Sequence, residues 1–108
     1  MKLFCFGFGQ VAQSFVDHLL KCNIELKLTT TSRKKTSELT FKNLEYFNYE
    51  FNENNFDKDL INPLQESDHI LISVPPINGK DMFIEKFVKN NLNLPNLKWL
   101  TYFCLLYT

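Results

Sequence analysis

The chain has 108 residues, of which 44% are hydrophobic and 22% are charged, and its formal net charge is zero. This length allows one small domain, and this composition excludes a disordered chain. A neutral chain has no overall field that attracts nucleic acid or an anionic membrane, so we expect neither as a partner. Gly7 and Gly9 interrupt the apolar N-terminus far short of a membrane span or a signal sequence, and we therefore expect a cytoplasmic protein.

The three cysteines, Cys5, Cys22 and Cys104, are widely spaced and include no Cys-x-x-Cys pair. A structural metal site or a disulfide framework needs such clusters, and the sequence predicts neither. We expect reduced thiols that are buried in the core.

The segment 7–12 reads Gly-Phe-Gly-Gln-Val-Ala and joins an apolar run, 2–6, to a helical pattern. In this G-x-G-x-x-A spacing, Gly7 allows a tight turn, Gly9 lets a pyrophosphate approach the backbone, and Ala12 lets the helix pack closely on the strand. The N–H groups at the start of the helix would bind the phosphates at the positive end of its dipole. The residues expected to hold the pyrophosphate are Gly7, Phe8, Gly9, Gln10 and Val11. The alternative is a plain tight turn, because such short strings also occur by chance.

A strand, a helix and a second strand are predicted around this motif. The apolar residues of the helix recur every three or four positions over 11–20. Asn23 is well placed to end the helix in a left-handed conformation, and the alternating, β-branched stretch 24–31 follows as a strand. This is the length of a βαβ unit, whose strands are parallel and whose crossover is right-handed.

The rest of the chain continues the alternation of strands and helices. The aromatic stretch 44–51 predicts a third strand, the apolar run 70–74 a fourth that is buried on both faces, and 99–106 a fifth. Between the strands, a loop is expected over 52–55. A short helix or an irregular crossover is expected over 56–65, broken at Asn62-Pro63. A turn at Asn78-Gly79 is expected to precede a helix over 81–90. Trp99 and the phenylalanines are expected in the core. The fold class is therefore α/β, a Rossmann-like doubly wound parallel sheet, with residues 1–108 as one partial NAD(P)-binding domain.

The second predicted strand ends in Thr-Ser-Arg-Lys-Lys over 31–35, where an NAD-binding protein usually has an acidic residue for the ribose hydroxyls. Arg33 can instead bind a 2′-phosphate through charge-assisted hydrogen bonds, and Ser32 can donate another. One well-placed bond of this kind, worth about 1.5–3 kcal/mol, corresponds to about a ten- to hundredfold preference. The sequence therefore favours NADP over NAD as the cofactor, with NAD also possible. The alternative is that 33–35 is only a solvated basic loop.

The fourth predicted strand ends in Ser-Val-Pro-Pro at 73–76, beside the first strand at the point where the strand order reverses. Val74 and Pro75 are expected to flank the adenine or ribose of the cofactor, although Pro-Pro is also an ordinary strand end. His18 is expected on the outer face of the helix, and His69 at the far end of its strand from the cofactor. Neither is placed to act as an acid or base, so no catalytic residue is predicted.

With the Gly-Phe-Gly-Gln-Val-Ala turn, the Thr-Ser-Arg-Lys strand end and the Ile-Leu-Ile-Ser-Val-Pro-Pro strand, the chain resembles the N-terminal half of a bacterial short-chain dehydrogenase/reductase. The likeness is to the extended or atypical group of NAD(P)-dependent sugar-nucleotide epimerases and dehydratases, and it covers the chain up to about Tyr102. Such proteins continue with a catalytic hydroxyl and a Tyr-x-x-x-Lys motif, and residues 103–108 contain no such motif. The resemblance thus implies a domain truncated after about the fifth strand and inactive alone. Its incomplete C-terminal edge would expose Trp99 and its neighbours and favour self-association.

Two other classes of protein share parts of this pattern. One is a regulatory module that senses a dinucleotide without chemistry; an acidic residue at the end of the second strand would favour it, and this chain lacks one. An enzyme of the β-hydroxyacid dehydrogenase or ketopantoate reductase kind also begins with Gly-x-Gly, but it needs a helical second domain. A degraded remnant that hardly folds is a third alternative.

Overall fold

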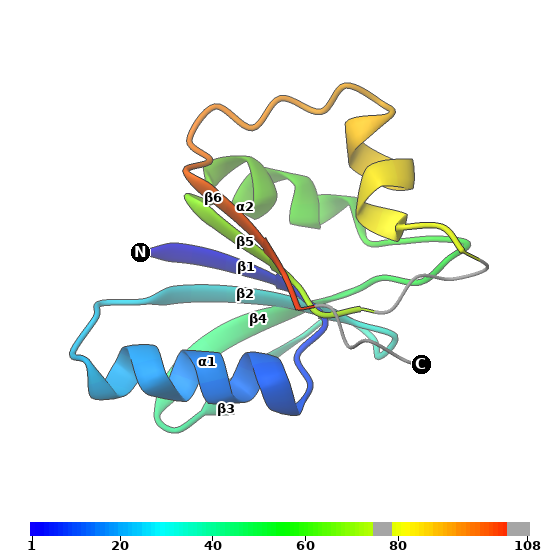
Figure 1. Cartoon of the computed structure of the whole chain (residues 1–108). Coiled ribbons are helices and arrows are strands. Elements are labelled where there is room, and N and C mark those ends of the chain that lie inside the picture. Colours follow the sequence, from blue (N-terminus) through cyan, green and yellow to red (C-terminus); the bar gives the residue numbers. More distant parts are fainter. Residues whose placement is uncertain (75–78, 104–108) are drawn as a thin grey trace.

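The computed structural model describes residues 1–74 and 79–103, which form a six-stranded sheet with helices on both faces (Figure 1). The strands are β1 (Lys2–Phe6), β2 (Lys27–Ser32), β3 (Ser37–Phe41), β4 (Leu44–Glu50), β5 (His69–Ile72) and β6 (Trp99–Tyr102). Their order is β3-β4-β2-β1-β5-β6, and every neighbouring pair is parallel except β3 and β4. This arrangement confirms the predicted α/β class with a mostly parallel, Rossmann-like sheet.

Different helices cover the two faces of the sheet. α1 (Gln10–Lys21) packs on one face, and the other carries the 3-10 turn η1 (Lys58–Leu60), α2 (Ile61–Glu66) and the π-helical turn η2 (Ile84–Val88) (Figure 1). Leu3 and Cys5 of β1 belong to the core on the α1 side, and Phe4 and Phe6 to the core on the α2 side. β1 is therefore buried on both faces, as the central strand of a parallel sheet requires. Within the described ranges, no helix is long and apolar enough to span a bilayer.

The end of α1 confirms the predicted left-handed residue. Asn23 has a φ of 58°. Its N–H donates to the carbonyl of Leu20 (3.0 Å), and the N–H of Ile24 donates to that of Leu19 (3.1 Å), so two carbonyls of the last turn are satisfied. Because Ile24 takes part in this closing turn, β2 begins at Lys27 and not at position 24.

The sequence pattern does not predict β3, which is an antiparallel edge strand paired with β4. The first four residues of β3 are exposed, so the strand has no buried face that would produce an alternating pattern. Lys42 and Asn43, with φ of 48° and 68°, form the two-residue turn of this hairpin. The connection from β2 to β4 thus runs through a strand and not a helix, and Phe47 on β4 remains 40% exposed.

Several predicted boundaries need correction. Pro63 does not break the crossover helix, because it is the third residue of α2, where a backbone N–H has no carbonyl four residues earlier within the helix. β5 ends at Ile72 and not at position 74, because its partner β1 ends at Phe6. The helix expected over 81–90 is shorter: η2 is π-helical, and Asn91, with a φ of 57°, closes it.

Other predicted elements fall partly outside the described residues. Of the Asn78-Gly79 turn, only Gly79 is described, and it has a φ of 75°. The fifth predicted strand is present as β6, which ends at Tyr102, and positions 104–106 lie outside the described residues.

Burial confirms part of the predicted core. The phenylalanines that are buried together on the α2 side are Phe4, Phe6, Phe51, Phe83 and Phe87. Trp99 is not a core residue, because it lies on the edge strand β6 and is 60% exposed. Leu100 beside it is 42% exposed, so the expectation that this edge exposes Trp99 and its neighbours is confirmed for these two residues.

The cysteines differ from one another. Burial raises the pKa of the Cys5 thiol to about 12, which keeps it protonated. Cys22 is exposed, so the expectation of a buried thiol is wrong there, because the residue caps the solvent-facing end of α1. Cys104 lies outside the described residues.

Candidate functional site

The carboxyl ends of the parallel strands meet at one edge of the sheet and surround a small hollow. We call it the carboxyl-edge pocket; it has a volume of about 80 Å³ and is lined by Gly7, Thr31, Ser32, Arg33, Phe51, Asn52, Val74 and Met82. Four of the residues predicted to bind a cofactor, Gly7, Ser32, Arg33 and Val74, therefore come together. In open α/β sheets, this edge is where ligands bind.

Gly7 forms the turn that leaves β1. Its φ is +85°, and a Cβ there would lie 2.9 Å from Val74 Cγ2 and 3.1 Å from Ser73 Oγ. Its N–H donates to Thr31 Oγ1 (3.2 Å), and its carbonyl accepts a hydrogen bond from Ser73 Oγ (3.1 Å). The turn is therefore attached to the ends of both neighbouring strands, and only glycine fits it without strain.

Gly9 is different, because it borders open space. It is the N-cap residue of α1, no side chain caps this helix, and the first turn contains no acidic residue. A Cβ at Gly9 would meet nothing within 4 Å. Gln10 and Val11 begin the helix and are exposed, and N–H groups of a first turn have no carbonyl four residues earlier within the helix. The geometry suits an anion that approaches the backbone from solvent.

Phe8 contributes to the turn through packing. Its ring lies 5.3 Å from those of Phe41 and Tyr46, within the α1-side core, and its carbonyl accepts a hydrogen bond from Gln13 Nε2 (3.0 Å). The side chain anchors the loop between β1 and α1 to the β3-β4 hairpin. This packing leaves Phe8 half-buried.

Ser32 is oriented by a buried polar network that the sequence analysis missed. Its Oγ accepts hydrogen bonds from Asn48 Nδ2 (2.9 Å) and from the Lys34 N–H (3.2 Å). Asn48 is buried in β4, and its Oδ1 accepts from Thr30 Oγ1 (2.9 Å). Because the Ser32 oxygen already accepts two bonds, its hydroxyl hydrogen can be donated to a ligand. The available signal was an asparagine within an aromatic strand, since a buried amide needs partners.

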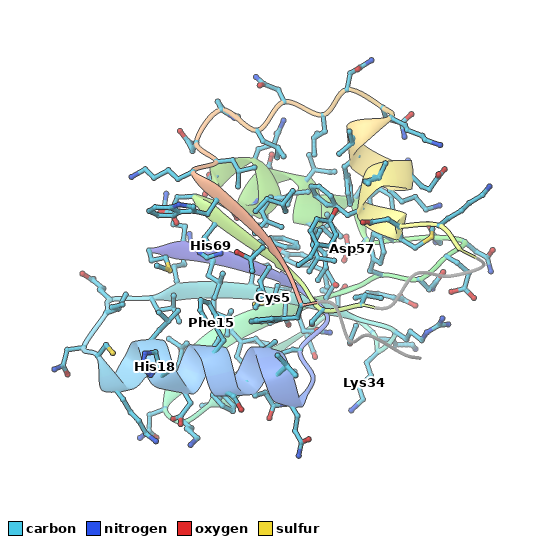
Figure 2. The ribbon with its side chains drawn as sticks, viewed as in Figure 1. Cys5, Phe15, His18, Lys34, Asp57 and His69 are labelled. Atoms are coloured by element: carbon cyan, nitrogen blue, oxygen red, sulfur yellow. The ribbon has the colours of Figure 1, made fainter. Side chains whose placement is uncertain are left out.

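Arg33 makes an ion pair that the sequence analysis also missed. Its Nη2 lies 2.9 Å from Glu53 Oε2, with the arginine side chain 68% exposed. The pKa of the Glu53 carboxyl lies below its usual value. The main cause is a hydrogen bond from the backbone N–H of Glu53 itself, and the charge of Arg33 adds to it. Figure 2 shows Lys34 extending into solvent near this edge, and Lys34 and Lys35 are both exposed.

The remaining predicted residues lie elsewhere or cannot be placed. Pro75 lies outside the described residues. His18 is exposed on α1, and His69 is the first residue of β5, at the opposite end of that strand from the pocket (Figure 2). In the described part of the chain, no three His, Cys, Asp or Glu side chains gather to hold a metal ion.

A larger, open groove of about 430 Å³ lies between α2 and the uncovered part of the sheet. The carboxylates Glu38, Glu45 and Glu66 line it, against one lysine, Lys27. An anionic cofactor would be repelled there, so the carboxyl-edge pocket is the better candidate.

A scan against protein-family models, a search of curated proteins and a search of solved structures each found no significant match. The case for a ligand at the carboxyl edge therefore comes from the residues themselves.

Proposed function

We propose that this chain is an NAD(P)-binding domain that holds its dinucleotide at the carboxyl-edge pocket, with NADP preferred. One observation carries the proposal: the left-handed Gly7 turn is closed against Ser73 and Val74, directly before an uncapped helix start with open space at Gly9. A tight turn, a bare backbone and a free helix N-terminus are the three features that a pyrophosphate site needs.

The proposed cofactor would bind in two parts. Its pyrophosphate would accept hydrogen bonds from N–H groups at the start of α1, favoured by the helix dipole. Its adenosine ribose would extend towards the end of β2, where the Ser32 hydroxyl and the Arg33 guanidinium can both donate to a 2′-phosphate.

The proposed activity class comes from the resemblance to the short-chain dehydrogenases/reductases. By that resemblance, the domain belongs to an oxidoreductase or epimerase of the short-chain dehydrogenase/reductase kind. We assign cofactor binding to this chain and assign no catalytic residue within it.

The direct test is thermal unfolding of the chain by far-UV circular dichroism, alone and with NADPH, NADH or ATP. A ligand at about 100 times its Kd stabilises the folded state by about 2.7 kcal/mol, which raises the midpoint of a domain of this size by about 10 °C. We expect the largest rise with NADPH. No rise with any of the three would contradict the proposal.

Gly9 provides a variant that separates binding from folding. In Gly9→Asp, the new side chain enters open space and can cap α1, so we expect the midpoint without ligand to stay the same or rise slightly. Its carboxylate should repel the pyrophosphate and abolish the shift with NADPH. Gly9→Asn is the matched control, since it caps equally well without the charge and should lose less affinity. Equal NADPH shifts in the wild type and Gly9→Asp would show that the ligand binds elsewhere.

A further inference from the structure

The ion pair between Arg33 and Glu53 lies at the border of the carboxyl-edge pocket. Arg33 and Asn52, the residue before Glu53, both line the pocket, and Arg33 Nη2 is 2.9 Å from Glu53 Oε2. The guanidinium proposed to bind a 2′-phosphate therefore already has an anionic partner from its own chain.

Backbone contacts hold the Glu53 loop beside β2. The N–H of Phe51, directly after β4, donates to the Ser32 carbonyl (2.8 Å). Asn52 then closes the loop, because its Oδ1 accepts from the N–H groups of Asn54 (2.9 Å) and Asn55 (2.8 Å), and its own N–H donates to the Asn55 carbonyl (2.9 Å). The pairing of β4 with β2 thus carries Glu53 to Arg33, and the ion pair does not depend on a freely moving loop.

A carboxylate and a phosphate compete for one guanidinium. Both are anions that bind its N–H donors, and two anions held around the same guanidinium repel each other at short distance. A 2′-phosphate can bind Arg33 fully only when Glu53 releases it, whereas the 2′-hydroxyl of NAD carries no charge and requires no such exchange. The competition therefore acts on NADP and not on NAD.

We propose that Glu53 is a specificity-determining residue that holds Arg33 and limits the preference of this site for NADP over NAD. The inference rests on the proposed cofactor function. The Arg33 side chain is 68% exposed and that of Glu53 is 36% exposed, so the effect should lie near that of a surface salt bridge, about a two- to fivefold change in affinity.

The test compares the Kd values of NADPH and NADH at low ionic strength, by titration of the wild-type chain and of Glu53→Gln. We expect Glu53→Gln to bind NADPH about two- to fivefold more tightly and NADH no more tightly, so that the NADPH preference rises. The control is Glu45→Gln, which removes the same charge from an exposed residue near the other end of β4 and should leave the preference unchanged. Circular dichroism melts without ligand establish that each variant is folded.

A double-variant cycle identifies the route. If Glu53 acts by holding Arg33, Glu53→Gln has no effect in the Arg33→Ala background. A gain that persists without Arg33 would mean direct repulsion and would overturn the inference. Equal NADPH preferences in Glu53→Gln and Glu45→Gln would also overturn the inference. That outcome would not contradict the proposed cofactor binding. Failure of every form of the chain to bind either dinucleotide would overturn the proposed function and this inference together.

Discussion

Gly7 and Gly9 belong to the same motif, yet the structure requires them for different reasons. Gly7 is needed by the fold, because its φ is +85° and Val74 and Ser73 leave no room for a Cβ. Gly9 is not needed by the fold, since its φ of −81° suits any residue and nothing lies within 4 Å. The open space at Gly9 therefore supports the proposed ligand site more directly than the Gly7 turn does.

Substitution of Gly7 tests this division of roles. We expect Gly7→Ala to lower the free energy of unfolding by about 2–4 kcal/mol, from the left-handed backbone and the close contact with Val74 together. Gly79→Ala is the control, because Gly79 has a φ of +75° but no neighbour within 4 Å and should lose only about 1–2 kcal/mol. Urea unfolding measures the free energy of unfolding of both variants. Equal losses in Gly7→Ala and Gly79→Ala would mean that the close contact with Val74 does not destabilise the Gly7 variant.

Among the secondary-structure elements, β5 and β6 are joined by a buried histidine. His69 Nε2 lies 3.0 Å from Thr101 Oγ1, and the ring packs between Phe15 of α1 and Trp99 of β6. Burial lowers the pKa of His69 from its ordinary value of 6.5, and the nearby charge of Asp68 only partly opposes this. The neutral imidazole is therefore the form that the folded sheet holds.

This lowered pKa has a consequence for stability. In the unfolded chain the His69 imidazole binds a proton near pH 6.5, and in the folded chain it does so only at lower pH. The contribution of His69 to the free energy of unfolding is therefore complete above pH 6.5 and is lost as the pH falls below that value. We expect the melting temperature to fall between about pH 7.5 and about pH 5.5, before most carboxylates titrate. The fall should be smaller in His69→Gln and unchanged in His18→Gln, whose histidine is exposed on α1. The same pH dependence in all three proteins would show that His69 is not its source.

For the whole molecule, the two edges of the sheet differ. β3 ends one side and carries Glu38 among its exposed residues, whereas β6 ends the other side of the described sheet with Trp99 and Leu100 exposed. An apolar edge strand can pair with another chain, while a charge on an edge opposes such pairing. The β6 edge is therefore the part of the described surface best suited to self-association.

Sedimentation velocity over a range of concentrations tests this expectation. We expect the wild-type chain to associate as its concentration rises, and Trp99→Lys to shift the population towards the monomer. Leu39→Lys is the matched control, because Leu39 is a 40% exposed apolar residue on the opposite edge strand, and it should associate as the wild type does. A wild-type chain that remains monomeric at high concentration would rule out this role for β6.

Local contacts explain which features could be read from the amino-acid order. The apolar run of β1, the glycines that follow it, and α1 with its left-handed end at Asn23 were all visible as local patterns of residues close together along the chain. β3 lacked that signal because its first four residues are exposed. The positions of Ser32, Arg33 and Val74 around Gly7 followed from strand order in a parallel sheet, and the pocket confirms that they are neighbours.

The partners of those residues depended on the fold alone. Asn48 reaches Ser32, and Glu53 reaches Arg33, because β4 pairs with β2 and brings distant parts of the chain within hydrogen-bonding distance. No spacing pattern encodes such a contact, since a single polar residue has no periodicity and its burial is set by packing. The amino-acid order thus predicted a glycine turn suited to a phosphate and a basic strand end, and tertiary pairing determined that the arginine of that strand end is held by a carboxylate.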